Sequence, residues 1–219
     1  MNKVIDIEKF SNKIKDGMTI MIGGFLGNGT PETLIDAIVE KGVKNLTIIA
    51  NDTAFVDKGI GKLIVNKQVK KVITSHIGTN KETGRQLNAG ELEVVLVPQG
   101  TLAEQVRAGG AGLGGILTPT GLGTIVEENK QKIVVDGKEY LLETPIRADV
   151  ALIAGSKVDK SGNAYHTKST RNFNPLMATA ADLVVVEAEK VVEIGEIDPD
   201  VVMTLGIFVD FVVRGETNG

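Results

Sequence analysis

The sequence predicts an α/β protein with an open, mostly parallel sheet, flanking helices and a β-hairpin insertion in its second half. Apolar runs of strand length alternate with segments of helical spacing in the first half, a pattern typical of parallel strands joined by crossover helices. In the second half, Asp136-Gly137 separates two strand-like segments and predicts a two-residue hairpin turn. No low-complexity linker and no internal repeat is evident, so we expect a single domain over residues 1–219.

The first half of the chain is expected to alternate between strands and helices. Thr19–Ile22 and Leu46–Ala50 are short apolar runs that indicate buried strands, whereas a helical segment such as Ile5–Ile14 shows helical spacing of its apolar residues. Thr30 is expected to cap the second helix, with Pro31 at its first position. The expected helices are Ile5–Ile14, Pro31–Glu40, Ile60–Asn66 and Thr101–Ala108, and the expected strands are Thr19–Ile22, Leu46–Ala50, Val69–Ser75 and Glu93–Val97.

The second half is expected to consist mainly of strands. The hairpin pairs Lys132–Val135 with Lys138–Leu142 across its turn. Val150–Ala154 and Asp182–Glu187 are then expected as buried strands, and Val191–Ile194 as a further strand. One α/β domain with a hairpin insertion is the simplest account of this order.

The composition argues against several classes of function. The formal net charge is −4 without a basic tract, so neither nucleic acid nor an anionic membrane surface is an expected partner. The chain has no cysteine, which excludes a disulfide, a thiolate nucleophile and a zinc–cysteine site. Charges interrupt the apolar residues of the N-terminus, unlike a signal peptide, and no apolar stretch is long enough to span a bilayer. We therefore expect a cytoplasmic protein.

Familiar catalytic and nucleotide motifs are missing or out of context. Gly110–Gly115 fits G-x-G-x-x-G, but it follows a helical segment and Pro119 prevents a long helix after it, so a dinucleotide site is not expected. Ser75 and His76 are adjacent on a strand and point to opposite faces, so they are not a nucleophile and its base. His76 and His166 are the only histidines, and both are expected to be structural or to support other residues. No spacing indicates a metal site.

The strongest candidate site is a glycine-rich loop, Gly24–Thr30, between an expected strand and a helix. Backbone N–H groups at a helix start favour an anion or a developing oxyanion, and glycine permits close approach to the backbone. Asn51 and Gln99 follow two other strands, and the carboxyl ends of parallel strands form the ligand crevice of an open sheet. These donors are therefore expected to converge. The alternative is that the glycines only make tight turns and the amides cap loops. Neither a nucleophile nor a general base accompanies the donors.

Several motifs in one order resemble the α (A) subunit of family I CoA-transferases, the 3-oxoacid CoA-transferase group. They extend over nearly the whole chain, and the resemblance is greatest to the bacterial short-chain enzymes acting on acetate, butyrate and acetoacetate. The motifs are Asp16-Gly17-x-x-Ile20-Met21-Ile22-Gly23-Gly24-Phe25-x-x-x-Gly29-x-Pro31, Glu91-Leu92-Glu93, Pro98–Glu104, Arg107–Gly112, Thr118-Pro119-Thr120-Gly121-x-Gly123-Thr124 and Lys168-Ser169-x-Arg171-Asn172-Phe173-Asn174.

The resemblance implies an enzyme subunit whose nucleophile lies on another chain. Family members move CoA between carboxylates by a ping-pong route through a glutamyl-CoA thioester, and the glutamate belongs to a Ser-Glu-Asn-Gly motif of the β subunit. This sequence lacks that motif, since Glu127–Lys130 does not match it. The implied substrates are CoA thioesters and short-chain carboxylates, without a permanent cofactor or metal. The implied partner is a β subunit in an α2β2 assembly, without which the chain is expected to be inactive.

The resemblance also assigns the site residues. It implies that Gln99 donates to the carbonyl oxygen of the partner's glutamyl thioester and that Asn51 supports the same site. Asp52 stands where the family usually has asparagine or another small residue. Phe25 is expected to pack beside the acyl and pantetheine channel. The implied CoA-binding residues are Gly24, Phe25, Leu26, Gly27, Asn28, Gly29 and Thr30.

Two other classes of function stay open at the level of sequence. The implied fold is shared with certain sugar-phosphate isomerases and with sensor domains that bind such ligands without chemistry. A sensor would be indicated by an attached helix-turn-helix segment, which is absent from this sequence. An isomerase would need a carboxylate with a lysine or histidine at the strand ends, and the sequence does not place one.

Overall fold

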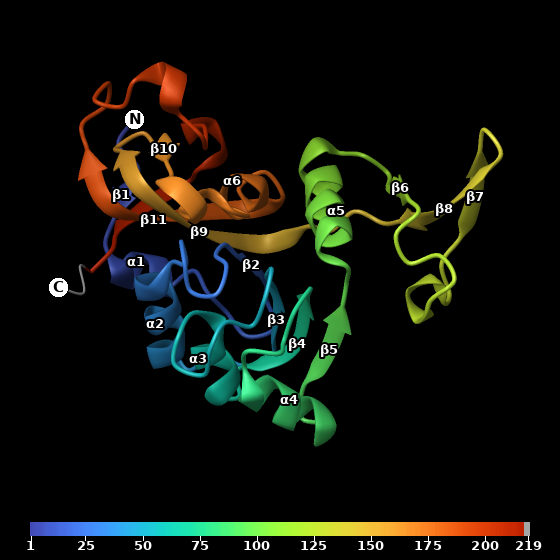
Figure 1. Cartoon of the computed structure of the whole chain (residues 1–219). Helices are drawn as coiled ribbons and strands as arrows, with labels where there is room; N and C mark the ends of the chain where they lie inside the picture. Colours follow the sequence, from blue (N-terminus) through green and yellow to red (C-terminus); the bar gives the residue numbers. More distant parts are fainter. Residues whose placement is uncertain (217–219) are drawn as a thin grey trace.

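The computed structural model describes residues 1–216 and contains a nine-stranded main sheet. Eight strands are parallel, whereas β10 (Ala164–Tyr165) pairs antiparallel with one of them, so the predicted open, mostly parallel sheet is confirmed (Figure 1). The order of the parallel strands is β1 (Val4–Ile5), β12 (Phe211–Arg214), β11 (Ala181–Val192), β9 (Ala148–Asp159), β2 (Thr19–Ile22), β3 (Leu46–Ile49), β4 (Val69–Thr74) and β5 (Glu93–Leu96).

Helices cover both faces of this sheet. On one face lie α1 (Ile7–Ser11), α2 (Glu32–Lys41) and α3 (Ile60–Val65), with α4 (Lys81–Asn88) packed beside α3. The opposite face is covered by α5 (Gln99–Ala111) and α6 (Asn174–Met177). The short 3-10 helices are η1 (Ile125–Glu127), η2 (Lys168–Arg171), η3 (Pro199–Val201) and η4 (Gly206–Phe208).

From Ile20 to Ile22, the central strand β2 is apolar without alternation because both of its faces are buried. In β2, Ile20 and Ile22 belong to the core beneath α1, α2 and α3, whereas Met21 points into the core beneath α5 and α6. All three are at most 1% exposed. Since successive side chains of a strand point to opposite faces, a run with no polar position is what a central parallel strand requires.

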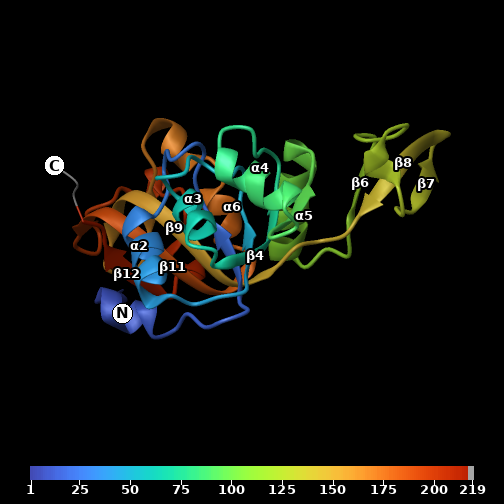
Figure 2. The ribbon, with the colours of Figure 1, turned by 90° about the horizontal axis from the view of Figure 1, so that it is seen from below.

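The predicted hairpin is present and belongs to a second, three-stranded antiparallel sheet. This sheet contains β6 (Ile116–Thr118), β8 (Lys138–Glu143) and β7 (Lys132–Val135), in that order. Asp136 and Gly137 both have positive φ, 49° and 73°, as a type I′ turn requires. The hairpin sheet stands apart from the main sheet in both views (Figures 1 and 2).

The base of the hairpin sheet is fixed by a buried carboxylate. Glu143 is 3% exposed and accepts hydrogen bonds from Lys130 Nζ at 2.6 Å and from Gln105 Nε2 at 3.0 Å. Gln105 lies on α5, so this network joins the hairpin sheet to the body of the molecule. A buried charge that lost either partner would be costly, so the network holds the hairpin sheet in one orientation.

The N-terminal helix is shorter than predicted. The expected helix Ile5–Ile14 was wrong at both ends, because β1 pairs with β12 in the sheet and α1 contains only five residues. Asp6 caps this helix through a 2.7 Å hydrogen bond to the Lys9 N–H. Local spacing could not reveal β1, since its partner lies at the other end of the chain.

Two other local predictions were wrong. Thr30 does not cap α2: Pro31 occupies the N-cap position and makes no capping hydrogen bond. The separate strand Val191–Ile194 does not exist, because β11 continues without interruption to Val192 and Ile194 lies exposed beyond it. One continuous strand forms because β9 pairs with β11 from Ala148↔Ala181 to Asp159↔Val192.

Helix α4 was not predicted because its sequence is mostly polar. Asn80 caps it by accepting from the N–H groups of Glu82 and Thr83. Gln86 is 1% exposed and donates to the carbonyl of Ile64 at the end of α3. The helix is therefore held by polar contacts that apolar periodicity does not report.

Candidate functional site

The glycine-rich loop lies at the topological switch point of the sheet. Strand β2 is flanked by β3 on one side and by β9 on the other, and the chain proceeds outward in opposite directions from β2 and β9. In open parallel sheets, ligands bind in the crevice beyond the carboxyl ends of the strands at such a point. The residues after Ile22 occupy this position, so the fold places the loop where ligands are expected.

The loop is a tight turn held by one asparagine. Phe25 and Asn28 exchange two backbone hydrogen bonds, of 3.0 and 2.8 Å. The Oδ1 atom of Asn172 accepts from the Gly24 N–H at 3.1 Å, and its Nδ2 group donates to the Asn28 carbonyl at 3.0 Å. A segment almost 150 residues away in sequence therefore sets the conformation of the loop.

Only part of the loop backbone remains available to a ligand. The N–H groups of Gly24, Phe25 and Asn28 are used within the protein, and that of Leu26 donates to Asp52 Oδ2 at 3.0 Å. Among residues 1–216, the N–H groups that have no hydrogen-bond partner in this loop are those of Gly27, Gly29 and Thr30.

The glycines are required first by the protein itself. A Cβ atom on Gly23 would lie 1.8 Å from Asn174 Oδ1. Gly29 has a φ of +65°, and a Cβ there would lie 2.6 Å from the Thr170 carbonyl oxygen. The alternative that the glycines serve tight turns is therefore supported, and the bare backbone is a consequence of how the loop packs on the Lys168–Asn174 segment.

Asn51 and Asp52 form a buried corner at the end of β3, next to the loop. Asn51 is 2% exposed; its carbonyl accepts from Ser75 Oγ at 2.6 Å, and its Oδ1 lies 3.2 Å from the same hydroxyl. Asp52 is 4% exposed and accepts from the N–H groups of Leu26 at 3.0 Å and Ala54 at 2.6 Å. The carboxylate at position 52 thus ties the glycine loop to the adjacent strand, a role that sequence reasoning did not assign.

Gln99 lies at the carboxyl ends of the strands, as the loop does, but it does not contact the loop. It is exposed and opens α5 directly after β5, which is the edge strand. Three strand spacings separate β2 from β5, or about 14 Å. The structure therefore brings the loop together with Asn51, as expected, but leaves Gln99 apart from them within this chain.

A second loop repeats the first, although no repeat was evident in the sequence. Phe55 and Lys58 pair across a turn as Phe25 and Asn28 do, and Gly59 has a positive φ of 52° like Gly29. Both loops follow adjacent strands, and a Cβ on Gly27 would lie 3.4 Å from Lys58 Cδ. Phe25 is 45% exposed and Phe55 is 38% exposed. The spacing F-x-x-x-G recurs at Phe25–Gly29 and Phe55–Gly59, and this recurrence could have revealed the second loop from the sequence.

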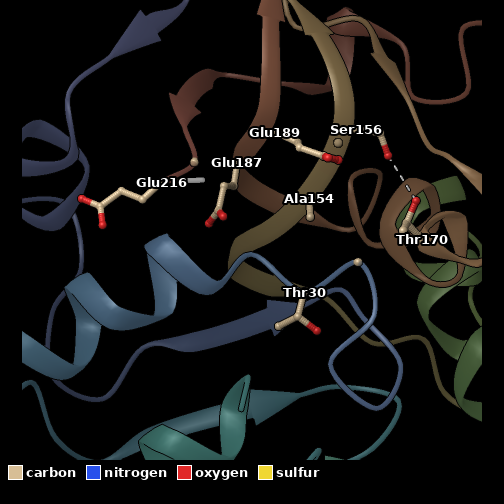
Figure 3. A pocket seen from close by; sticks show the side chains of 10 residues that line it. Thr30, Ala154, Ser156, Thr170, Glu187, Glu189 and Glu216 are labelled. Atoms are coloured by element: carbon tan, nitrogen blue, oxygen red, sulfur yellow. Dashed lines mark hydrogen bonds between the residues drawn. The ribbon is translucent and has the colours of Figure 1, made fainter. Parts of the chain in front are cut away.

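A polar cavity of about 280 Å³ lies between the loop and strands β9 and β11 (Figure 3). Ser156 Oγ and Thr170 Oγ1 are 3.3 Å apart on one wall. Three carboxylates line it, but no lysine or histidine belongs to its lining among the described residues, so the arrangement required for a self-sufficient isomerase is not found here. Its polar side chains are Thr30, Ser156, Thr170, Glu187, Glu189 and Glu216.

Glu187 binds the start of α2, immediately after the loop. Its Oε2 atom accepts from the Leu34 N–H at 3.0 Å. Burial raises the pKa of this carboxyl to about 7, although the hydrogen bonds from Leu34 and Thr33 oppose that shift. The charge of Glu187 therefore changes close to neutral pH.

The raised pKa of Glu187 predicts a stability difference that depends on pH. Between about pH 4.5 and pH 7 the folded state binds a proton that the unfolded state releases, so the stability from this group falls as the pH rises through that range. We expect Glu187→Gln to match the parent protein at pH 5 and to be more stable at pH 8, measured by urea unfolding. A variant equally stable or less stable at pH 8 would contradict this expectation.

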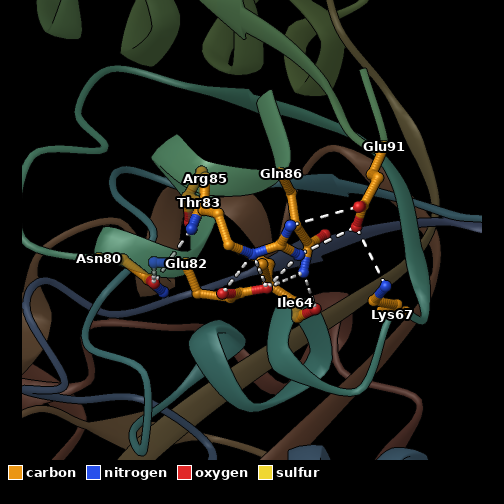
Figure 4. A network of polar contacts seen from close by, with 8 residues as sticks. All are labelled: Ile64, Lys67, Asn80, Glu82, Thr83, Arg85, Gln86 and Glu91. Carbon is orange, nitrogen blue, oxygen red and sulfur yellow. Dashed lines mark hydrogen bonds and ion pairs between the residues drawn. The ribbon is translucent and has the colours of Figure 1, made fainter. Parts of the chain in front are cut away.

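A second polar cluster lies at the amino ends of the strands, on the side of the sheet opposite to the loop (Figure 4). Arg85 on α4 binds Glu82 at 2.8 Å and Glu91 at 2.9 Å, and Lys67 binds Glu91 at 3.1 Å. Hydrogen bonds from Arg85 lower the pKa values of Glu82 and Glu91 to about 2. Lys67 and Glu91 precede the amino ends of β4 and β5, so this exposed network lies away from the ligand edge, where ion pairs of this kind contribute little to stability.

The histidines do not form a catalytic pair. His166 is 1% exposed, and its Nε2 atom lies 2.8 Å from Thr204 Oγ1. Burial lowers the pKa of His166 to about 4, so it is neutral at physiological pH. His76 is exposed after β4. Within residues 1–216, no three His, Cys, Asp or Glu side chains are grouped to hold a metal ion, and no helix is long and apolar enough to cross a bilayer.

The chain is similar to known proteins over nearly its whole length. The chain is 58% identical over 211 residues to the acetate CoA-transferase subunit alpha of Escherichia coli K12, and 96% of each chain is covered. It is 55% identical over 213 residues to the acetoacetyl-CoA:acetate/butyrate CoA transferase alpha subunit of Clostridium acetobutylicum, covering 97% of this chain and 98% of that one.

A solved structure has the same fold. The acyl-CoA transferase of Escherichia coli O157:H7 superposes with a TM-score of 0.86 at 26% identity, and the match covers 97% of this chain but only 47% of that one. This chain therefore spans about half the length of that enzyme. The family model described as coenzyme A transferase matches residues 5–215. The chain belongs to the coenzyme A transferase family.

Proposed function

We propose that this chain is the α subunit of a short-chain acyl-CoA:carboxylate CoA-transferase that uses acetate, butyrate or acetoacetate. The observation that supports this best is the near full-length similarity, at 58% identity over 211 residues, to a protein named as an acetate CoA-transferase α subunit. The site geometry agrees, because backbone N–H donors of the loop lie at the ligand edge of the sheet, next to the buried amide of Asn51. The buried carboxylate nearest to the loop, Asp52, is already bound to two backbone N–H groups.

The proposed chemistry needs a glutamate from a β subunit. That carboxylate attacks the acyl-CoA carbonyl, forms a mixed anhydride and releases CoA thiolate. The thiolate then attacks the glutamyl carbonyl of the anhydride, which gives the glutamyl-CoA thioester and releases the first carboxylate. The second carboxylate reverses these steps and leaves with CoA. Each addition places negative charge on a carbonyl oxygen, which hydrogen-bond donors stabilise.

The residues of this chain would bind the thioester and stabilise those oxyanions. Gln99 is exposed at the ligand edge, so its amide can reach a carbonyl oxygen on the partner subunit. Asn51 supports the neighbouring corner, and the loop Gly24–Thr30 binds the CoA thioester through its remaining N–H groups. Phe25 offers an apolar wall beside the acyl and pantetheine chain. An α2β2 assembly in the cytoplasm is part of the same proposal.

A transfer assay tests this division of the active site. Acetoacetyl-CoA with acetate or butyrate would be given to this chain, to its β partner and to their mixture, and product thioesters would be separated by liquid chromatography. We expect turnover only in the mixture. Turnover by this chain alone would place the nucleophile here and overturn the proposal. Absence of turnover in all three samples, with CoA thioester still bound, would favour a binding module.

A further inference from the structure

We propose that a cavity lined by Arg107 and Arg171 binds the phosphate-bearing nucleotide end of the CoA thioester. This inference rests on the proposed function and deepens it, since none of the residues assigned so far recognises that part of the substrate. The cavity has a volume of about 470 Å³, which is within the range of small-molecule sites.

Two sequence motifs that the loop chemistry does not use meet at this cavity. Arg107–Gly112 supplies the wall at the end of α5, and Lys168–Asn174 supplies the wall from η2 onward. The glycines of the first motif explain how the walls approach. A Cβ on Gly110 would lie 2.1 Å from Thr179 Oγ1, so only glycine lets α5 pack against the end of α6 here.

The charged residues that line the cavity are all positive, although the protein carries a net charge of −4. Both of its charged lining residues are arginines, and no carboxylate lines it. Arg107 is paired with Glu104 at 3.0 Å on the surface. Arg171 is exposed and has no ion pair among residues 1–216. A guanidinium group without a carboxylate partner is suited to bidentate binding of a phosphate.

The remaining lining suits a planar base rather than a small acid. Pro175, Leu176 and Phe208 provide apolar surface, and Phe208 is 42% exposed. An acetate or butyrate ion would fill little of such a cavity. An adenosine carrying phosphates combines an apolar face with strong acceptors, and it is therefore the part of a CoA thioester that this lining matches.

The cavity also adjoins the glycine loop. Asn172 lines the cavity and, through its own side chain, binds both the Gly24 N–H and the Asn28 carbonyl. One elongated substrate can thus place its thioester beside the loop and its nucleotide between the arginines. Asn172, which shapes the loop, is next in sequence to Arg171, which would hold the phosphate.

Steady-state kinetics of the reconstituted αβ complex test this assignment. Arg171→Gln is expected to raise the KM for acetoacetyl-CoA about tenfold or more, because a charge-assisted hydrogen bond is lost, while kcat and the KM for acetate stay unchanged. The same variant should have little effect on the KM for 3′-dephospho-acetoacetyl-CoA if Arg171 binds the 3′-phosphate, and a similar effect on both thioesters if it binds the diphosphate. Arg214→Gln removes an exposed arginine that does not line the cavity, and should change none of these values.

Three results would overturn the assignment. One is a rise in the KM for acetate instead of the thioester. Another is an unchanged KM for both thioesters. The third is a lowered Tm with normal kinetics, which would mean that Arg171 only stabilises the fold. If the complex shows no transfer at all, the proposed function fails; calorimetry with CoA then decides this inference separately, which requires binding to the parent complex and weaker binding to Arg171→Gln.

Discussion

Gln99→Ala is expected to lower turnover of the reconstituted enzyme about a hundredfold to a thousandfold, as loss of one oxyanion donor does elsewhere. The side chain is exposed and follows the edge strand β5, where it is free to face a partner subunit. It makes no side-chain hydrogen bond within residues 1–216, so its removal should leave the fold of this chain intact. The kcat for acetoacetyl-CoA and acetate is the quantity to measure, alongside the mass of the complex.

The matched control is Gln131→Ala, which removes the other exposed glutamine and should retain full turnover. A near-normal kcat for Gln99→Ala would remove that residue from the mechanism. A complex that fails to assemble would instead assign Gln99 to the subunit interface. Measuring the mass of the complex before its turnover rate distinguishes these two results.

Gly23→Ala is expected to destabilise the protein by about 3 kcal/mol, because it displaces a buried side chain that makes four hydrogen bonds. The added Cβ would lie 1.8 Å from Asn174 Oδ1, and Asn174 is 0% exposed. Asn174 accepts from the Ala154 N–H and donates to the Gly29 and Thr170 carbonyls. Moving it disturbs the loop, so activity should fall together with a Tm lowered by roughly 6–12 °C.

Gly84→Ala is the matched control for this substitution. Gly84 lies in α4, and a Cβ there would meet nothing within 4 Å. Alanine is the better helix former, so Gly84→Ala should be neutral or slightly stabilising. A thermal unfolding curve for Gly23→Ala that matches the parent protein would show that Asn174 yields without cost and that the close packing argued for the loop is wrong.

How far the sequence predicts each element depends on the kind of contact that forms it. Strands β2 and β3 were predicted because each is a short buried apolar run, and the turn at Asp136-Gly137 because its φ angles require those residues. Helix α4 was missed because a cap and a buried amide stabilise it. The pairing of β1 with β12 was missed because the partners are about 200 residues apart.

The candidate site likewise contains features that the sequence predicted and features that it did not. The loop Gly24–Thr30 and the Asn51 corner were predicted as neighbours, and the order of β2 and β3 places them together. The anchoring roles of Asp52 and Asn172 could not be predicted, since each depends on which backbone group faces its side chain. The separation of Gln99 from the loop likewise follows from strand order, which periodicity does not specify.

Sequence patterns were sufficient to identify the class of this protein: parallel strands joined by helices, a hairpin insertion, and the family to which its motifs belong. Those features depend on local conformational preference and on the pattern of apolar residues along the chain. Only the tertiary structure decided that the glycines pack on Asn174 and Thr170, that the loop retains few free N–H groups, and that two distant arginine motifs line one cavity. The physical reason is that these features are contacts between segments far apart in sequence, and only the order and register of the strands bring such segments together.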